Sequence, residues 1–339
     1  MSKLRIAING FGRIGRITLR NLVNRPELEV VAINDLTDNE TLAHLFKYDS
    51  VHGTFQGDVS SDEDSITVNG NRMRAFSERD PKNLPWADLD IDVVIESTGF
   101  FRTKEAVSQH LTAGAKKVVI SAPAAGSEFI RSVVMGVNGD EVTAEDLILS
   151  NASCTTNCAA PMVKVLDEAF GVESGLITTI HAYTGDQKLQ DAPHKDLRRA
   201  RAAAENIVPT STGAADAITK IFPHLKGKMG GAGIRVPVPD GSLTELTCVV
   251  KNATTVEIVN SLFNDAANNG LKGVLEYTEV PLVSRDILGN PHSCIFDADL
   301  TIVVGNMVKI VGWYDNEYGY SARLADLMVK LHAYKLEIA

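Results

Sequence analysis

The stretch Leu4-Arg-Ile-Ala-Ile-Asn-Gly10-Phe-Gly12-Arg-Ile-Gly15 decides the fold of the first half of this chain. A short apolar run ends in glycines with the spacing G-x-G-x-x-G, and an amphipathic stretch follows until Arg25-Pro26. A second apolar run then leads to Asp35, about 20 residues after Gly15. This order predicts a strand, a glycine turn, a helix and a second strand, which together form a dinucleotide-binding unit.

Each part of this unit has a physical role. Gly10 allows a tight turn, Gly12 lets the backbone approach a pyrophosphate, and Gly15 lets the helix pack closely against the sheet. The N-terminus of the helix then faces the phosphates. Asp35 can accept hydrogen bonds from a ribose hydroxyl and would repel a 2′-phosphate, so we expect NAD and not NADP.

The rest of the first half continues this pattern. Short apolar runs at 93–95, 118–120 and 133–137 favour further strands of a parallel sheet that is covered on both faces. Thr37-x-x-Glu40 resembles a helix capping box, and Gly114 resembles the glycine that follows a helix. Ser97-Thr98-Gly99 forms either a further cofactor loop or an ordinary turn.

From about residue 176 the pattern changes to longer alternating stretches, at 243–251 and 306–314, which are typical of antiparallel strands. Helices are expected at about 256–269 and from about 317 onward. The segment between Tyr183 and Ile207 has no strand alternation and is interpreted as a functional loop. Its tail, Leu197 to Asn206, has a composition that also suits a helix.

These patterns predict an α/β chain with two domains. The first is a Rossmann-type domain with a doubly wound parallel sheet, over 1–153, completed by a C-terminal helix at 317–339. The second is an α+β catalytic domain over 154–316, with a largely antiparallel sheet.

Cys154 stands in Ser150-Asn-Ala-Ser-Cys154-Thr-Thr-Asn-Cys158, among small polar residues that are not typical of an apolar core. A helix is expected to follow, and both the free N–H groups and the dipole of a helix N-terminus lower a thiol pKa. We therefore expect a nucleophilic thiolate. Pro161 either kinks this helix or marks a regular part that starts later than Cys154.

His181 ends the strand-like run from Leu176 to Ile180. Taken alone, it could be a structural histidine, but paired with Cys154 it becomes a candidate base or charge partner. The other three cysteines, Cys158, Cys248 and Cys294, are interpreted as packing residues. No His/Cys spacing suits zinc, so no metal site is expected.

Two basic features suit anion binding. The run from Lys195 to Arg201 is either a solvated face or a phosphate-binding segment, because arginine binds phosphate in a bidentate way. Arg235 lies in the strand-like setting Ile-Arg-Val-Pro-Val-Pro, where a cation is unusual unless it binds an anion.

The overall composition limits the possible partners. With 33 basic and 43 acidic residues among 339, the net charge of −10 gives no support for nucleic-acid binding. No apolar run reaches the length of a membrane-spanning helix, and the first residues lack the apolar region of a signal peptide. Four cysteines are too few for a disulfide framework, which favours a cytoplasmic location.

Taken together, these segments make the chain similar to the phosphorylating glyceraldehyde-3-phosphate dehydrogenases of glycolysis. The resemblance runs from the glycine turn to Trp313-Tyr-Asp-Asn-Glu-Tyr-Gly-Tyr320 and so covers nearly the whole length. Further matching segments are Leu45-Phe-Lys-Tyr-Asp-Ser50, Glu96-Ser-Thr-Gly99, Ala192-Pro-His-Lys-Asp-Leu-Arg-Arg-Ala-Arg201 and Pro209-Thr-Ser-Thr-Gly-Ala-Ala215.

The resemblance implies roles for single residues. Cys154 would be the nucleophile and His181 the general base. The cofactor NAD would be bound by Gly10, Gly12, Arg13, Ile14, Gly15, Asp35, Arg79, Ser121, Asn316 and Tyr320. The phosphate groups of substrate and co-substrate would be bound by Ser153, Thr155, Thr184, Arg199, Thr212, Gly213 and Arg235.

The resemblance also implies the reaction and the assembly. Glyceraldehyde 3-phosphate would form a hemithioacetal on Cys154 and then an acyl thioester, which inorganic phosphate would convert to 1,3-bisphosphoglycerate. A homotetramer is expected, with the loop after Tyr183 reaching a neighbouring subunit. Leu36 and Pro193 also match the NAD-specific pattern. The glycine-rich segment Lys226-Gly-Lys-Met-Gly-Gly-Ala-Gly233 departs from the common pattern, so the resemblance does not specify the exact shape of one phosphate site.

Three alternatives remain at this point. Erythrose-4-phosphate dehydrogenase shares the cysteine and the histidine, but Thr212-Gly-Ala-Ala215 and the segment from Arg235 to Gly241 favour the glyceraldehyde enzyme. A semialdehyde dehydrogenase would lack the matches at Arg198–Arg201 and Trp313–Tyr320. A binding protein without catalysis, for RNA or a cell-surface partner, is disfavoured because every expected catalytic position is filled.

Overall fold

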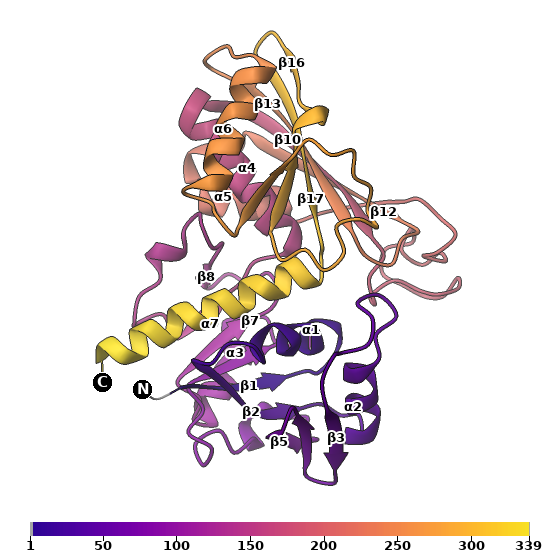
Figure 1. Cartoon of the computed structure of the whole chain (residues 1–339), viewed down its shortest axis with the longest axis vertical. Coiled ribbons are helices and arrows are strands. Elements are labelled where there is room, and N and C mark those ends of the chain that lie inside the picture. Colours follow the sequence, from indigo (N-terminus) through magenta and orange to yellow (C-terminus); the bar gives the residue numbers. More distant parts are fainter. Residues whose placement is uncertain (1–2, 339) are drawn as a thin grey trace. The chain divides into compact units, whose positions relative to one another are not determined.

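The computed structural model describes residues 3–338, which form two compact units. Unit 1 comprises Met1–Val133, Gly139–Ala152 and Ser321–Ala339. Unit 2 comprises Val134–Asn138 and Ser153–Tyr320. The chain therefore leaves unit 1, builds unit 2 and returns to unit 1 with its last helix, the long yellow helix of Figure 1.

Unit 1 is built on a nine-stranded sheet with the order β3-β4-β5-β2-β1-β6-β7-β9-β8. Its strands are β1 Leu4–Asn9, β2 Leu28–Asn34, β3 Val59–Asp62, β4 Ser65–Val68, β5 Asn71–Phe76, β6 Val93–Glu96, β7 Lys117–Ile120, β8 Arg131–Ser132 and β9 Ile148–Ser150. All pairs among the described residues are parallel except β3 with β4 and β4 with β5. The carboxyl ends of the central strands therefore meet at one edge, where ligands bind in such sheets.

The helices of unit 1 follow the strands. They are α1 Arg13–Leu22, α2 Asn39–Lys47, α3 Lys104–Thr112 and the part of α7 (Tyr318–Ile338) from Ser321 onward, with 3-10 turns η1 Pro81–Asn83 and η2 Gly139–Glu141. Helix α3 ends as predicted, because Gly114 takes a φ of +102° just beyond it. Helix α7 is tied to unit 1 by Lys335 to Asp92 (2.6 Å) and Arg25 to Asp326 (2.9 Å).

Unit 2 is built on an eight-stranded sheet with the order β11-β12-β10-β13-β17-β15-β14, and β16 pairs with β17. Its strands are β10 Val172–Ala182, β11 Val208–Thr210, β12 Met229–Val236, β13 Ser242–Val250, β14 Leu275–Thr278, β15 Cys294–Asp297, β16 Ile302–Val304 and β17 Met307–Tyr314. In the part of the chain that the structure describes, only β10 with β12 and β14 with β15 are parallel here, so the predicted, largely antiparallel sheet is confirmed.

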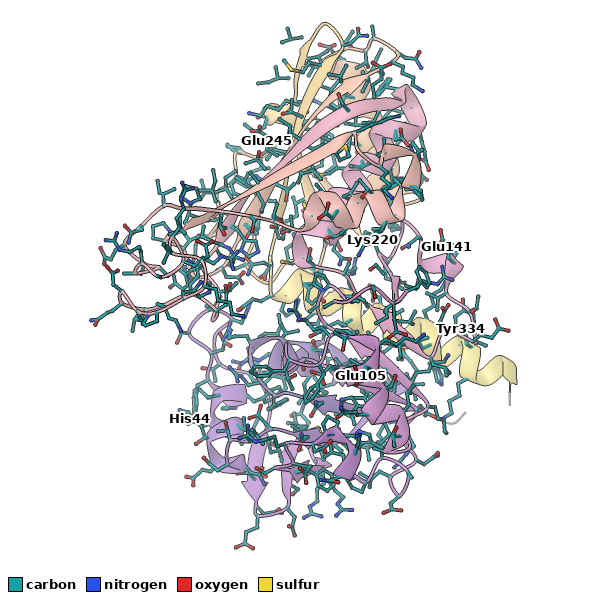
Figure 2. The ribbon with its side chains drawn as sticks, turned by 180° about the vertical axis from the view of Figure 1, so that it is seen from behind. His44, Glu105, Glu141, Lys220, Glu245 and Tyr334 are labelled. Carbon is teal, nitrogen blue, oxygen red and sulfur yellow. The ribbon has the colours of Figure 1, made fainter. Side chains whose placement is uncertain are left out.

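One face of this sheet is covered by helices, as Figure 1 shows. These are α4 Cys154–Phe170, α5 Ala214–Ile221 and α6 Val256–Asn268, and the 3-10 turns are η3 Pro223–Leu225 and η4 Ala298–Leu300. The opposite face carries the ion pair of Glu245, labelled in Figure 2, with Lys309 (2.9 Å). Apolar side chains on the same face are exposed to solvent, which is unusual for the surface of a monomeric protein. They are Leu176, Val249, Ile302, Val304 and Met307.

Three local predictions are wrong. The run 133–137 is not a strand, because Gly136 takes a φ of +81° and the Asn138 side chain accepts a bond from the Val134 N–H, which closes a turn. The cap of α2 is Asp38, not Thr37, and it accepts from the Thr41 N–H (2.8 Å). The segment 197–206 forms turns instead of a helix.

Candidate active site

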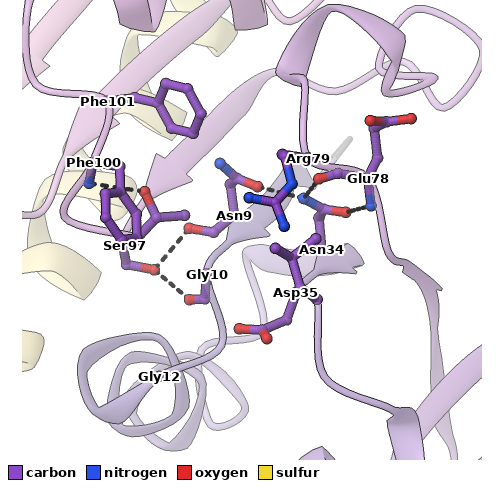
Figure 3. A pocket seen from close by; sticks show the side chains of 12 residues that line it. Asn9, Gly10, Gly12, Asn34, Asp35, Glu78, Arg79, Ser97, Phe100 and Phe101 are labelled. Atoms are coloured by element: carbon purple, nitrogen blue, oxygen red, sulfur yellow. Dashed lines mark hydrogen bonds between the residues drawn. The ribbon is translucent and has the colours of Figure 1, made fainter.

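A pocket of about 360 Å³ opens at the carboxyl edge of the unit 1 sheet. Figure 3 shows its walls, which are the glycine turn after β1, the end of β2, the segment after β5 and the loop after β6. The residues that line it are Asn9, Gly10, Gly12, Asn34, Asp35, Leu36, Glu78, Arg79, Ser97, Thr98, Phe100 and Phe101. The pocket thus contains Gly10, Gly12, Asp35 and Arg79 from the predicted cofactor site.

The glycine turn fits the dinucleotide that the sequence predicts. A Cβ atom on Gly10 would lie 2.6 Å from the Thr98 backbone nitrogen, and one on Gly15 would overlap the Gly10 carbonyl oxygen. A Cβ on Gly12 would meet nothing within 4 Å, so the backbone there is open to a ligand. Gly10 and Gly15 therefore serve internal packing, while Gly12 leaves space for a phosphate group.

The N-terminus of α1 has the properties of an anion site. Gly12 is its N-cap, no side chain caps it, and its first turn holds no acidic residue. Asp35 accepts bonds from the N–H groups of Phe11 (2.8 Å) and Thr37 (3.0 Å), and so holds the glycine turn to the end of β2. The orphan N–H groups and dipole of α1 suit a pyrophosphate, and the Asp35 carboxylate suits a ribose.

The other predicted cofactor residues of unit 1 lie at the same edge of the sheet. Arg13 starts α1 and pairs with Asp49 (2.5 Å), and Ile14 follows it. Ser121 follows β7, and its N–H donates to the Glu96 carbonyl (2.9 Å). Asn316 and Tyr320 belong to unit 2 and are described there.

In unit 2, Cys154 is the first residue of α4. Ser153 caps this helix by accepting from the Thr156 N–H (3.0 Å), and Pro161 lies inside the continuous helix. The regular part therefore begins at Cys154 itself. This residue keeps part of its exposure, whereas Cys158, Cys248 and Cys294 are buried as predicted.

His181 faces Cys154 because of the strand alternation in β10. Ile177, Thr179 and His181 point to the face that α4 covers. The Cys154 Sγ and His181 Nε2 atoms lie 3.3 Å apart. His181 Nδ1 lies 2.7 Å from the Ala182 carbonyl oxygen, which can only accept, and 3.0 Å from Arg235 Nη1, which can only donate. Arg235 Nη1 has the Ala182 carbonyl and the Thr184 hydroxyl as other acceptors, so we assign the ring proton to Nδ1 from the shorter contact. The lone pair of Nε2 then points at the thiol.

Burial favours the neutral forms of both Cys154 and His181. Burial raises the pKa of the Cys154 thiol to about 11, although Arg235 and the Thr155 N–H act to lower it. Burial, helped by Arg235, lowers the pKa of His181 to about 3. The expected lowering of the thiol pKa is therefore wrong, because the loss of water around sulfur outweighs the helix N-terminus and the nearby cation.

Two arginines stand beside this pair. Arg235 donates from Nη1 to the Ala182 carbonyl and the Thr184 hydroxyl, both at 2.9 Å. Arg199 donates to Thr210 (3.0 Å) and pairs with Asp186 (2.5 Å). These bonds gather Thr184, Arg199 and Arg235 near His181 and make this corner of unit 2 suitable for anions.

The remaining predicted residues of unit 2 differ in their surroundings. Thr155 bonds to the Tyr314 hydroxyl (3.0 Å), and Asn316 accepts from Ser242 (2.6 Å) through its side-chain oxygen. Tyr320 is buried. Thr212 and Gly213 lie at the N-terminus of α5, where Thr212 accepts from the Ala214 N–H (3.2 Å).

Sequence reasoning missed two residues of this site. Tyr314 bonds to Thr155 and to Thr179 (2.8 Å), and its ring meets His181 edge-on. Asp186 accepts from Thr184 and Arg199 and so holds both in place. Alternation along β17 could have placed Tyr314 on the covered face, but no local signal marks Asp186.

The chain is similar to known proteins along nearly its whole length. Residues 4–104 match the family model "Glyceraldehyde 3-phosphate dehydrogenase, NAD binding domain", and residues 153–316 match the model of the C-terminal domain of the same family. It is 55% identical over 329 residues to glyceraldehyde-3-phosphate dehydrogenase 2 of Streptomyces avermitilis, which covers 96% of this chain and 98% of the relative.

Two further relatives are similar to the same extent. The glyceraldehyde-3-phosphate dehydrogenase of Mycobacterium avium is 56% identical over 332 residues, or 96% of this chain and 97% of that protein. Glyceraldehyde-3-phosphate dehydrogenase 2 of Bacillus subtilis is 53% identical over 328 residues, or 96% of each chain. Within residues 3–338, no helix combines the length and the apolar character needed to cross a membrane.

Proposed function

The chain belongs to the glyceraldehyde-3-phosphate dehydrogenase family, and from this premise we propose that it oxidises glyceraldehyde 3-phosphate with NAD and inorganic phosphate. The product is 1,3-bisphosphoglycerate. The observation that carries the proposal is the 3.3 Å contact between Cys154 Sγ and His181 Nε2, with Arg235 beside the imidazole.

Unit 1 is the NAD-binding domain in this proposal, and unit 2 is the catalytic domain. The open backbone at Gly12 and the uncapped start of α1 hold the pyrophosphate, and Asp35 holds the adenosine ribose. The cofactor site also takes in Arg13, Ile14, Arg79 and Ser121, with Asn316 and Tyr320 at the nicotinamide end. NAD, when bound, supplies the acceptor for a hydride.

Cys154 begins the reaction. Its sulfur forms a bond to the aldehyde carbon, and the thiol proton moves to His181 Nε2, which the Nδ1–H tautomer leaves free to accept it. In this proposal both groups start neutral. The proton transfer creates an imidazolium, which the negative charge on the aldehyde oxygen stabilises. The imidazolium then returns a proton to this oxygen, and the result is a hemithioacetal on Cys154.

His181 then acts as general base for the oxidation. It accepts the hydroxyl proton of the hemithioacetal while the carbon loses its hydride, which leaves an acyl thioester on Cys154. Inorganic phosphate attacks the thioester carbon and the carbon–sulfur bond breaks. The sulfur takes back the proton held on His181, which restores the neutral pair, and the hydroxyl proton of the phosphate goes to solvent. Forming the thioester before phosphate attacks conserves the free energy of oxidation that hydrolysis would dissipate.

Arginines bind the two phosphate groups in this proposal. The principal ligands are Arg199, Arg235 and Thr184, and further donors come from Ser153, Thr155, Thr212 and Gly213. In the structure, the Asp186 carboxylate pairs with Arg199 and accepts a hydrogen bond from the Thr184 hydroxyl. Phosphate therefore has to compete with the Asp186 carboxylate, which favours dianions over singly charged ligands.

A homotetramer in the cytoplasm is part of the proposal. The exposed apolar face of the unit 2 sheet, with Leu176, Val304 and Met307, supports an interface between copies. Leu189 and Leu197, in the loop after Tyr183, are 84% and 82% exposed, which suits a loop that packs against a neighbouring subunit. All four cysteines are free, which fits a reducing compartment.

The test is NADH formation from glyceraldehyde 3-phosphate and NAD, with and without inorganic phosphate. Sustained turnover that requires phosphate is expected. A single burst of NADH that stalls with phosphate present would contradict the proposed acceptor, and turnover with erythrose 4-phosphate that exceeds turnover with glyceraldehyde 3-phosphate would contradict the substrate. NADP is expected to support the reaction poorly because of Asp35.

A further inference from the structure

Beneath the cofactor pocket, a chain of polar side chains crosses the interior of unit 1. Its members come from β1, β2, the loop before β6, β6 itself and α3, and each is at most 5% exposed. They are Asn9, Asn34, Trp86, Glu96 and His110. A buried polar group without a partner destabilises a fold, so the bonds among these residues decide whether the cluster is stable.

The Glu96 carboxylate is the centre of this network. Its Oε2 atom accepts from Asn9 Nδ2 (2.6 Å) and lies 3.0 Å from His110 Nε2. Its Oε1 atom accepts from the Thr98 N–H (2.8 Å) and the Thr98 hydroxyl (2.5 Å). Four donors around two oxygens suit an ionised carboxylate in the interior.

Trp86 fixes the tautomer of His110. The indole nitrogen can only donate, and it lies 3.0 Å from His110 Nδ1, so Nδ1 accepts. The proton of the neutral ring is therefore on Nε2, where it is donated to Glu96. Both ring nitrogens are used, and the histidine connects a large, fully buried side chain to the carboxylate.

The network reaches three walls of the pocket, as Figure 3 shows for its pocket end. Through Thr98, Glu96 holds the loop that packs against Gly10, and Ser97 donates to the Gly10 carbonyl (2.6 Å). Through its Oδ1 atom, Asn9 accepts from Asn34 (2.7 Å). Asn34 in turn bonds both backbone groups of Glu78, next to Arg79, at 2.8 Å.

We propose that Glu96 and His110 are positioning residues for the dinucleotide. Neither lines the pocket, but together they set the spacing between the glycine turn and the Ser97–Gly99 loop. The inference deepens the proposed function and rests on NAD binding to unit 1. It also places the Ser97-Thr98-Gly99 triplet in the cofactor site, because the conformation of this triplet depends on the Glu96 carboxylate that accepts from Thr98.

The test compares Glu96→Gln and His110→Leu with the parent chain. The amide introduced by Glu96→Gln would place N–H groups against existing donors, and His110→Leu would remove one donor from the carboxylate. A hydrogen bond to a charged group is stronger than one between neutral groups, so the Kd for NAD is expected to rise about tenfold or more. The kcat at saturating NAD is expected to stay within about threefold of the parent value.

Two controls separate positioning from general damage. His110→Gln keeps an amide donor for Glu96 and an acceptor for Trp86, and is expected to restore the Kd to within about threefold of the parent. Glu29→Gln changes a surface carboxylate paired with Arg5 in the same unit and is expected to leave NAD binding unchanged. Thermal unfolding of each variant reports whether it is folded.

The outcomes are distinct. Unchanged NAD affinity in folded Glu96→Gln and His110→Leu would overturn the inference, and so would a parallel loss of kcat and affinity. If both variants failed to fold, the network would be structural only and the inference would also be wrong. Absence of NAD binding by the parent chain would instead contradict the proposed function.

Discussion

The pocket of unit 1 and the Cys154–His181 corner of unit 2 are built from different kinds of chemical group. The pocket of unit 1 is formed largely by backbone, with Gly10, Gly12 and the start of α1 at its centre. The corner of unit 2 is formed by side chains, and Cys154 and His181 have strongly shifted pKa values. Backbone recognition is spread over many small contacts, whereas covalent chemistry depends on single atoms. Substitutions should therefore have moderate effects on activity in unit 1 and much larger effects at Cys154 and His181 in unit 2.

Replacing the nucleophile gives the largest expected effect. Cys154→Ala should lower kcat by a factor of about 10⁴ or more, because no other group can form the thioester. The Kd for NAD should stay within about twofold, because the cofactor contacts lie elsewhere. Cys248→Ala, at a buried thiol of β13, is the matched control. Residual NADH formation close to the parent rate in Cys154→Ala would refute the covalent mechanism.

Replacing the base gives the next effect. His181→Gln should lower kcat by about 10²–10⁴, since the side chain can no longer take a proton from sulfur or from the hemithioacetal. His224→Gln, at an exposed histidine paired with Asp167 in the same unit, should have no effect on kcat. Steady-state rates at saturating substrate measure both. Equal kcat values for His181→Gln and the parent would show that another group is the base.

Arg235 should affect the thiol through charge. It lowers the pKa of Cys154 and of His181, so Arg235→Gln should raise both pKa values. Only the thiolate is alkylated, so the rate–pH curve for iodoacetamide should rise toward a pKa of about 11 in the parent and shift to higher pH in the variant. Arg201→Gln, at an exposed arginine of the same unit that pairs with Asp191, should not shift the curve. A shift to lower pH would contradict the assigned sign.

Asp35 should have a graded effect in unit 1. Asp35→Ser removes a charged acceptor for the ribose, so kcat/KM with NAD should fall about tenfold and kcat/KM with NADP should rise. Asp38→Ser, three residues further along, changes only the cap of α2 and should leave the NAD to NADP ratio unchanged. An unaltered ratio in Asp35→Ser would remove Asp35 from the specificity site.

The smallest expected effect concerns stability. Burial acts to raise the pKa of Asp49, but the His52 N–H and Arg13 hold it at about 2. A carboxyl group whose pKa is lowered by folding stabilises the fold at pH values above its pKa in the unfolded state. This stabilisation is lost as the pH falls toward the lower pKa of the folded state. Asp49→Asn should therefore lower the free energy of unfolding by about 1–2 kcal/mol at pH 7. Urea unfolding should show this difference shrinking from about pH 4 to pH 2, and a constant difference would contradict the assignment.

The sequence predicts the type of each sheet and the strand–turn–helix unit of the first half, but not the contacts between particular side chains far apart in the chain. The spacing from Leu4 to Gly15 is enough to specify a strand, a turn and a helix, because these contacts lie within a few residues. The 3.3 Å contact of Cys154 with His181 depends on how β10 packs against α4, which no local pattern reports. The segment 197–206 looks helical, but Arg199 and Arg201 pair with Asp186 and Asp191 and the chain turns instead.

The thiol pKa shows the same limit. The sequence contains the helix N-terminus that lowers the pKa of Cys154, but it does not contain the loss of water that raises it. Burial is a property of the assembled fold, in which Tyr314 and Arg235 come from strands far along the chain. The pKa of a buried group therefore cannot be predicted from sequence until the packing around that group is known.

The return of helix α7 to unit 1 has a consequence for synthesis. Lys335 bonds to Asp92 across 243 residues of chain, and Tyr334 bonds to Val142 across 192. At roughly 5–20 residues per second, a ribosome needs on the order of 10–50 s to make the intervening segment. During that time the sheet of unit 1 lacks this helix, because the ribosome is still synthesising unit 2. The catalytic half can therefore fold first, and the nucleotide half is finished only after all of unit 2 has been synthesised.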